Sequence, residues 1–109
     1  MYDFTACIVT HNTEKEELRK IIECVQKIGL RFKLWISDNS EKNDLKQFIE
    51  GFLDARIKYI FNNSNGGFGA GHNVVIKRLV EGEVEAKFHL IINADVFLRK
   101  ILLRKLLNI

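Results

Sequence analysis

Glycine and asparagine crowd into one stretch of this sequence, residues 62–73 (NNSNGGFGAGHN), between a strand-like and a helix-like segment. Glycine admits backbone conformations with positive φ and lets a ligand approach the main chain. The helix predicted behind the stretch, from about residue 73 to 80, presents unpaired N–H groups that attract an anion. The stretch therefore predicts a cradle for a ligand. A flexible surface connection is the alternative, because both residue types also dominate ordinary turns.

Three further polar clusters each follow a strand-like segment in the same way. They are Thr10-His11-Asn12, Asp38-Asn39-Ser40 and Asn93-Ala94-Asp95. A carboxylate accepts a hydrogen bond from a nucleobase N–H or binds a hard cation such as Mg²⁺ or Mn²⁺. Asp38 and Asp95 therefore predict one contact to a base and one metal ligand. An Asx turn at Asp38 and a helix cap at Asp95 are the alternatives.

Other site chemistries are disfavoured. The glycines at 67, 69 and 71 are followed by His72, where a dinucleotide-binding G-x-G-x-x-G motif needs glycine, and no Walker-type Gly-Lys-Ser/Thr follows them. The three histidines (His11, His72, His89) lack the short spacings of a structural zinc site, and we interpret His72 as a candidate phosphate contact. No serine has the G-x-S-x-G setting of a hydrolase nucleophile.

Alternating strand and helix patterns must position these clusters. Nearly continuous apolar runs predict strands at 4–10, 32–37, 57–61 and 88–92. Apolar residues at helical spacing predict helices at 13–28, 45–53, 73–80 and 97–109. This alternation predicts an α/β fold with a parallel sheet. The carboxyl ends of parallel strands lie along one edge, so the four polar clusters are expected to converge on one ligand-binding crevice.

Composition limits the classes of function. The chain has 109 residues, of which 47% are apolar and 28% charged, and this predicts one globular domain over 1–109. Its net charge of +3 comes without a clustered basic face, which disfavours nucleic-acid binding. The N-terminal residues do not form a secretory signal, no apolar run reaches about 20 residues, and Cys7 and Cys24 lack metal or disulfide spacing. We expect a cytoplasmic protein.

The four motifs at 8–12 (IVTHN), 36–40 (ISDNS), 65–73 (NGGFGAGHN) and 90–96 (LIINADV) resemble, in order and spacing, the N-terminal half of a family 2 glycosyltransferase of GT-A fold. The likeness is greatest to the rhamnosyltransferase-like branch of that family. It implies a Rossmann-like, mostly parallel four-stranded sheet in the order 3-2-1-4, with helices on both faces. It also implies binding of a UDP- or dTDP-sugar for transfer to a saccharide acceptor, as in cell-wall polysaccharide biosynthesis.

The resemblance implies roles for individual residues. The end of the first strand lines the base and ribose, Asp38 bonds the uracil or thymine ring N–H, and the glycine-rich stretch wraps the nucleotide. Asp95 binds Mg²⁺ or Mn²⁺, although Ala94 stands where this branch usually has proline. The implied nucleotide-binding residues are Thr10, His11, Asn12, Asp38, Asn39, Ser40, Asn65, Gly67, Phe68, Gly69, Gly71, Asn73 and Asn93.

Length is the main departure from the family pattern. Family members run well beyond 200 residues, and their second half carries the acceptor site and the general base that an inverting transfer needs. We therefore expect the acceptor half to be absent, assign no catalytic residue, and expect binding of a donor, with transfer only if the missing half is supplied. The alternative function is a non-catalytic nucleotide-binding or assembly module.

Two segments predict contacts with partners. Without a neighbouring strand, residues 88–92 form an apolar sheet edge that pairs readily with another chain, so we expect a homodimer through this edge or its coverage by the tail helix. The tail, residues 97–109, combines leucines with Arg99, Lys100, Arg104 and Lys105. This pattern suits peripheral contact with the inner face of an anionic membrane, and a helix packed on the sheet is the alternative.

Overall fold

The computed structural model describes residues 1–64 and 66–93, and every structural statement below concerns that part of the chain. Three features predicted from the sequence lie outside it. They are Asn65 of the nucleotide site, Asp95 as the metal ligand, and the tail helix at 97–109.

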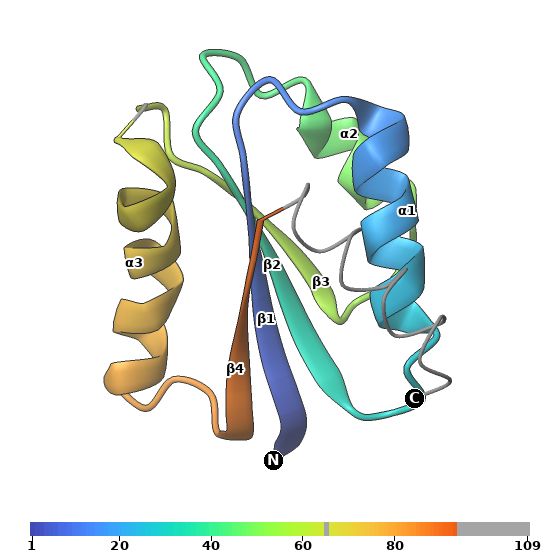
Figure 1. The fold of residues 1–109 in the computed structure, drawn as a ribbon, viewed down its shortest axis with the longest axis vertical. Coiled ribbons are helices and arrows are strands. Elements are labelled where there is room, and N and C mark those ends of the chain that lie inside the picture. Colours follow the sequence, from blue (N-terminus) through green and yellow to red (C-terminus); the bar gives the residue numbers. More distant parts are fainter. Residues whose placement is uncertain (65, 94–109) are drawn as a thin grey trace.

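Strands and helices alternate along the described chain, as the periodicity predicts (Figure 1). The elements are β1 (Tyr2–Thr10), α1 (Lys15–Gln26), β2 (Phe32–Asp38), α2 (Leu45–Glu50), β3 (Ile57–Phe61), α3 (Gly67–Val80) and β4 (Ala86–Ile92). Each predicted strand and helix within this range is present. The largest difference is the start of α3, which lies six residues before the predicted one.

The sheet has four strands, all parallel, in the order β3-β2-β1-β4. The expected order 3-2-1-4 is therefore confirmed. β1 is central and pairs through Cys7 with Trp35 of β2 on one side and with Ile91 of β4 on the other. Because all four strands run the same way, their carboxyl ends share one edge, and the polar clusters at 10–12, 38–40, 62–64 and 93 follow these ends.

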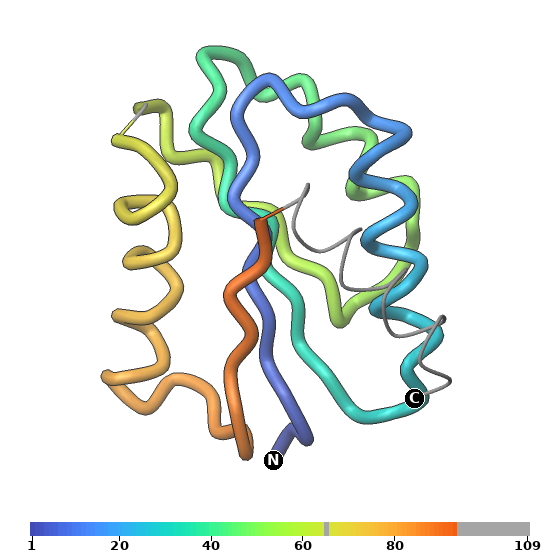
Figure 2. The backbone as a smooth tube through the Cα atoms, viewed as in Figure 1, coloured from blue at the N-terminus to red at the C-terminus, as the bar shows by residue number. Residues whose placement is uncertain are grey.

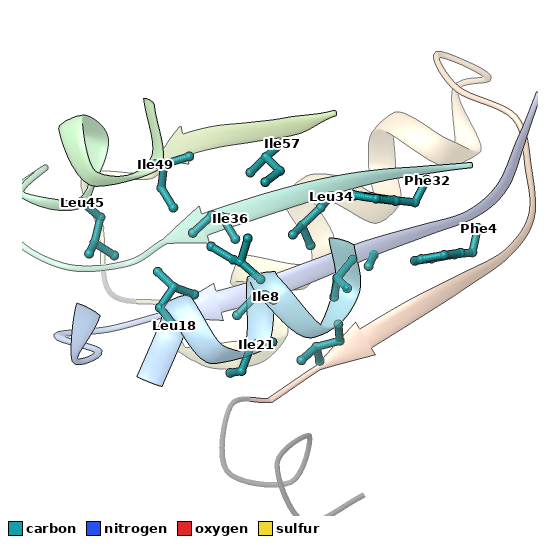
Figure 3. Close-up of a cluster of buried hydrophobic side chains, with 14 residues drawn as sticks. Phe4, Ile8, Leu18, Ile21, Phe32, Leu34, Ile36, Leu45, Ile49 and Ile57 are labelled. Carbon is teal, nitrogen blue, oxygen red and sulfur yellow. The ribbon is translucent and has the colours of Figure 1, made fainter. Parts of the chain in front are cut away.

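The helices cover both faces of the sheet. Helices α1 and α2 lie on one face and α3 lies on the other, as the ribbon and the backbone tube both show (Figures 1 and 2). The main core fills the space between the sheet and α1 and α2 (Figure 3), and it is built from alternate residues of β1 and β2 together with the apolar face of α1. Its largest members include Phe4, Ile8, Leu18, Phe32 and Ile36.

A smaller core lies under α3. It consists of Cys7, Val9, Trp35 and Val75, so β1 and β2 are buried on both faces, as their continuous apolar runs predict. Burial raises the pKa of the Cys7 thiol to about 12. Cys7 therefore behaves as a small core residue and has no thiolate character at neutral pH.

The glycine-rich stretch forms the first turns of α3, so the predicted start of this helix at about residue 73 is wrong. The reason is tertiary packing. A Cβ atom built on Gly71 would lie 2.8 Å from both Cγ atoms of Val9 and 3.1 Å from Nδ2 of Asn39. A helix without a side chain at this position can approach β1 closely, and this gain outweighs the low helix propensity of glycine.

Candidate functional site

Asp38, the last residue of β2, lies at the centre of a buried hydrogen-bond network. Its side chain is fully buried. Oδ1 accepts hydrogen bonds from the Thr10 hydroxyl at 2.9 Å and from the Ser40 backbone N–H at 3.0 Å. Oδ2 accepts a hydrogen bond from the Tyr59 hydroxyl at 2.5 Å. A carboxylate only accepts, so these three donors match its chemistry and hold it in one orientation.

Tyr59 is a site residue that the sequence analysis missed. It lies within the apolar run of β3, where an aromatic residue normally indicates core packing. Burial raises the pKa of its phenol, and the hydrogen bond to Asp38 raises it further, so Tyr59 stays a donor at neutral pH. The pairing of β2 with β3 explains the contact. Tyr59 pairs with Ile36, two residues before Asp38, so Tyr59 and Asp38 lie on the same face of the sheet.

The ends of β1 and β2 are joined to each other beyond the sheet. The Asn39 backbone N–H donates to the Thr10 carbonyl at 2.8 Å, and the Asn12 backbone N–H donates to the Ser40 hydroxyl at 2.9 Å. Asn12 has a φ of 52°, a left-handed conformation that asparagine tolerates better than most residues. The loops after β1 and β2 therefore hold each other in place, while the side chains of His11 and Asn12 remain exposed.

A second network joins the end of β2 to the first turns of α3. Asn39 Nδ2 donates to the Gly67 carbonyl at 2.8 Å, and the Ser37 hydroxyl donates to the Gly71 carbonyl at 2.8 Å. Asn62, just after β3, donates to Asn39 Oδ1 at 2.7 Å and to the Ser37 hydroxyl oxygen at 2.9 Å. These side chains fix the glycine-rich turns against the sheet edge, so Asn39 acts in this structure by positioning α3.

A cavity of about 1080 Å³ opens beside the Asp38 network, on the face covered by α1 and α2. It lies between the segment that links β1 to α1 and the segment that links β2 to α2, and it has both acidic and basic lining residues. Of the predicted nucleotide-binding residues, Asn12 and Ser40 line it. The volume is close to that of ligand pockets in general, about 300–1000 Å³.

The start of α3 presents its backbone at the same edge. The N-cap residue Gly66 has no side chain that could cap the helix, and the first N–H groups of a helix have no partner within the helix itself. Gly67 has a φ of 84°, which favours glycine, and the neighbouring Phe68 side chain is 55% exposed. Gly69 and Asn73 are exposed as well. These residues are not part of the cavity lining.

His72 does not point to the surface. It is a buried residue of α3, and neither ring nitrogen has a hydrogen-bond partner among the residues that the structure describes. Burial lowers the pKa of its imidazole, while the nearby Asn93 side chain opposes this effect without reaching hydrogen-bond geometry. A buried imidazole cannot offer the exposed phosphate contact that we predicted for His72.

His89 of β4 belongs to the same cluster. Its Nδ1 lies 2.8 Å from the Thr5 hydroxyl, whereas its Nε2 is buried and unpartnered within residues 1–64 and 66–93. Burial lowers the pKa of His89, and the nearness of His72 lowers it further. The α3 side of β4 thus holds two neighbouring imidazoles with incomplete hydrogen bonding.

The comparison with known families decides the identity of the fold. The family described as glycosyl transferase family 2 matches residues 5–109. The chain belongs to this family. No curated protein and no solved structure matches the chain. The parallel sheet, its 3-2-1-4 order and the helices on both faces are consistent with the GT-A fold of this glycosyltransferase family. Membership supports a nucleotide-sugar-binding glycosyltransferase domain, with a saccharide as the general class of acceptor.

The structure divides the family-implied site residues into two groups. Thr10, Asp38, Asn39 and Ser40 are buried and take part in the networks of the β2 end, and Gly71 is buried against Val9. The remaining described members are exposed along the carboxyl edge, and they are His11, Asn12, Gly67, Phe68, Gly69, Asn73 and Asn93. The first group holds together the loops at the end of β2, and the side chains of the second group are exposed.

The metal expectation for this glycosyltransferase domain rests on Asp95, which lies outside the described residues. Within residues 1–64 and 66–93, no three His, Cys, Asp or Glu side chains come together as a metal site. In the same part of the chain, no helix is both long and apolar enough to cross a membrane.

Proposed function

We propose that this chain binds the nucleotide part of a UDP- or dTDP-sugar at the carboxyl edge of its sheet, as the donor domain of a glycosyltransferase. The observation that carries the proposal is the Asp38 carboxylate, which three donors hold in place at the end of β2. One of these donors is the backbone N–H of Ser40, which lines a cavity of about 1080 Å³. Uracil and thymine each carry one ring N–H, and a fixed carboxylate is the acceptor suited to it.

Other residues along the edge suit the rest of the ligand. Asn12 and Ser40 line the cavity beside Asp38, where a ribose attached to the base would lie. The N-terminus of α3 suits a diphosphate, because a helix N-terminus attracts negative charge. Phe68, which is 55% exposed, offers an apolar face to a sugar ring.

A divalent cation completes the proposed site. We assign it to Asp95, with Mg²⁺ or Mn²⁺ as the ion, because hard cations prefer carboxylate and phosphate oxygens. When bound, such an ion neutralises charge on the diphosphate. We further propose that the chain belongs to the rhamnosyltransferase-like branch of the family and takes part in cell-wall polysaccharide biosynthesis.

Calorimetric titration of the full 109-residue chain tests the proposal. We expect UDP or dTDP to bind in the presence of Mn²⁺, and CDP to bind at least tenfold more weakly, because cytosine has no ring N–H to offer Asp38. Asp95→Ala is expected to weaken binding with Mn²⁺ and to leave metal-free binding unchanged. Equal affinity for UDP, dTDP and CDP would contradict the role of Asp38, and a chain that binds none of them would contradict the proposed function itself.

Donor binding does not require that the chain alone transfers sugar. Inverting transfer needs a base that deprotonates the attacking hydroxyl group, and we assign no residue to this role. Incubation of the chain with a radiolabelled donor and a saccharide acceptor separates the two functions. Tight binding without transfer or hydrolysis favours the alternative, a non-catalytic nucleotide-binding module.

A further inference from the structure

The hydroxyl group of Tyr59 occupies the acceptor position on Asp38 that a ligand would need. Oδ1 of Asp38 already accepts from Thr10 and from Ser40, whereas Oδ2 accepts from Tyr59 alone. The Asp38 side chain is fully buried with the phenol in place. A base N–H can therefore bond Oδ2 only if the phenol moves aside or shares this oxygen.

Tyr59 is only partly enclosed by the protein. It is half-buried, and among the described strands β3 pairs only with β2, at one edge of the sheet. Its ring packs against the margin of the main core, and within the described chain its hydroxyl is held by the hydrogen bond to Asp38 alone. The Tyr59 hydroxyl is linked to the cavity lining through Asp38, because Oδ1 of the same carboxylate accepts from the backbone N–H of Ser40, which lines the cavity.

We propose that Tyr59 is a specificity-determining residue, whose hydroxyl takes the place of the pyrimidine ring N–H on Asp38 Oδ2 until a ligand displaces it. The inference rests on the proposed function. A uracil or thymine ring replaces the lost donor with its own N–H, so Asp38 stays fully bonded. A ring without this N–H offers no replacement and would leave a buried carboxylate short of a donor, which is unfavourable.

Competition of this kind has a distinctive consequence. Tyr59→Phe removes the competing donor, so the N–H of uracil gains a hydrogen bond to Asp38 without the loss of another. We expect UDP to bind roughly tenfold more tightly to Tyr59→Phe, because the hydrogen bond that is gained is to a charged group, and a tenfold change corresponds to about 1.4 kcal/mol. The diphosphate of N3-methyluridine, which lacks only this hydrogen, is expected to keep its affinity within about twofold.

Titration of both ligands against three forms of the chain is the test. The forms are the wild type, Tyr59→Phe and the matched control Tyr2→Phe, which removes the only other tyrosine hydroxyl, at the opposite end of the sheet. Tighter UDP binding by Tyr59→Phe alone, without an equal change for the N-methylated ligand, is the expected result. Weaker UDP binding by Tyr59→Phe would show that the hydroxyl contacts the ligand, and an equal change for both ligands would show a purely structural role. Either outcome overturns the inference.

A second measurement covers the case in which Tyr59→Phe does not fold. The ¹³Cζ resonance of Tyr59 in the wild-type chain reports on the hydrogen bond of its hydroxyl. We expect this resonance to shift on addition of UDP and to remain in place on addition of the N-methylated ligand. The same response to both ligands contradicts the inference. UDP binding without any Tyr59 effect contradicts this inference alone, whereas a chain that binds neither UDP nor dTDP contradicts the proposed function as well.

Discussion

Two buried polar clusters in this sheet differ in how completely their hydrogen bonds are formed. At the ends of β1, β2 and β3, the Asp38 carboxylate accepts from three donors, and Ser37, Asn39 and Asn62 bond one another and α3. Between α3 and β4, three imidazole nitrogens of His72 and His89 are buried without a partner in the described part of the chain. Burial of polar groups is compensated in the first cluster and incompletely compensated in the second.

The two clusters therefore have different structural roles. A saturated network fixes side chains and loops, and such preorganisation suits a binding site because a ligand need not order them. A cluster with unpartnered groups is less favourable in the folded state and responds to a change in protonation. The loops around Asp38 at the ends of β1 and β2 are therefore expected to be rigid, and the stability of the α3–β4 cluster is expected to depend on pH.

The comparison predicts its largest effect at Asp38. Asp38→Ala leaves the Thr10 hydroxyl, the Ser40 N–H and the Tyr59 hydroxyl buried without their acceptor. We expect the free energy of unfolding to fall by at least about 3 kcal/mol, as measured by urea denaturation. Glu41→Ala, which removes an exposed carboxylate from the cavity lining, is the control and is expected to change stability by less than about 0.5 kcal/mol. A loss below about 1 kcal/mol for Asp38→Ala would contradict the central role of this network.

The contact between α3 and β1 is expected to be the next most sensitive to substitution. Gly71→Ala places a Cβ atom 2.8 Å from Val9, and neither the core nor the Asn39 amide leaves room for it. We expect a loss of about 1–3 kcal/mol in the free energy of unfolding, together with weaker nucleotide binding, because α3 must move away from the end of β2.

Gly69→Ala is the matched control for this change. A Cβ atom on Gly69 meets no atom within 4 Å, and the residue lies in the same helix. Alanine has the higher helix propensity, so we expect a gain of up to about 1 kcal/mol. Loss of stability at both positions would show that the glycine-rich turns need backbone freedom and that the close approach at Gly71 is not the reason for glycine.

The cluster with unpartnered nitrogens predicts a dependence of stability on pH. The pKa values of His72 and His89 are lowered in the folded chain, so the unfolded chain binds more protons just below its own histidine pKa of about 6.5. The stabilisation from neutral imidazoles is thus fully present above about pH 6.5 and is lost as the pH falls below it. Each histidine contributes a slope of at most about 1.4 kcal/mol per pH unit.

Urea denaturation between pH 5 and 8 measures this slope. His72→Phe is expected to reduce it, because one of the two buried imidazoles is removed. His11→Gln, which changes an exposed histidine at the other end of the site, serves as the control and is expected to leave the slope as it is. Stability that rises as the pH falls from 7 to 5.5 would mean that the cluster prefers the charged imidazoles, and the contrast with the Asp38 cluster would then be wrong.

The fold was largely predictable from periodicity. The continuous apolar runs of β1 and β2 and the helical spacing in α1 indicated a parallel α/β sheet, and the family resemblance supplied its strand order. The start of α3 was not predictable in this way. Glycine disfavours helices, and these residues are helical because of tertiary contacts, namely the close approach of Gly71 to Val9 and the hydrogen bonds from Ser37 and Asn39 to the Gly71 and Gly67 carbonyls.

The candidate site was predictable in its location and less so in its details. Polar residues at strand ends indicated the correct edge, including Asp38. Their burial was not apparent, because Asp38 and Asn39 are enclosed by contacts with Thr10, Tyr59 and Gly67, which lie at least 21 residues away along the chain. Strand patterns show which face a residue occupies, but they do not show which polar partners meet there.

The smallest effect on stability is expected at β4, which lies at one edge of the described sheet and has exposed apolar side chains. Phe88 and Ile91 of β4 are 50% and 59% exposed, whereas the core-facing residues of β1 are buried. We predict that β4 pairs with a second copy of the chain, because an apolar sheet edge is a template for strand pairing and a charge on it prevents such pairing. Ile91→Lys should leave the stability of the monomer within about 0.5 kcal/mol and abolish the dimer seen by light scattering. Val80→Lys, at an 81% exposed apolar residue that ends α3, should leave the dimer intact. A wild-type chain that remains monomeric at about 100 μM would rule out this pairing, since a specific dimer interface is expected to hold at that concentration.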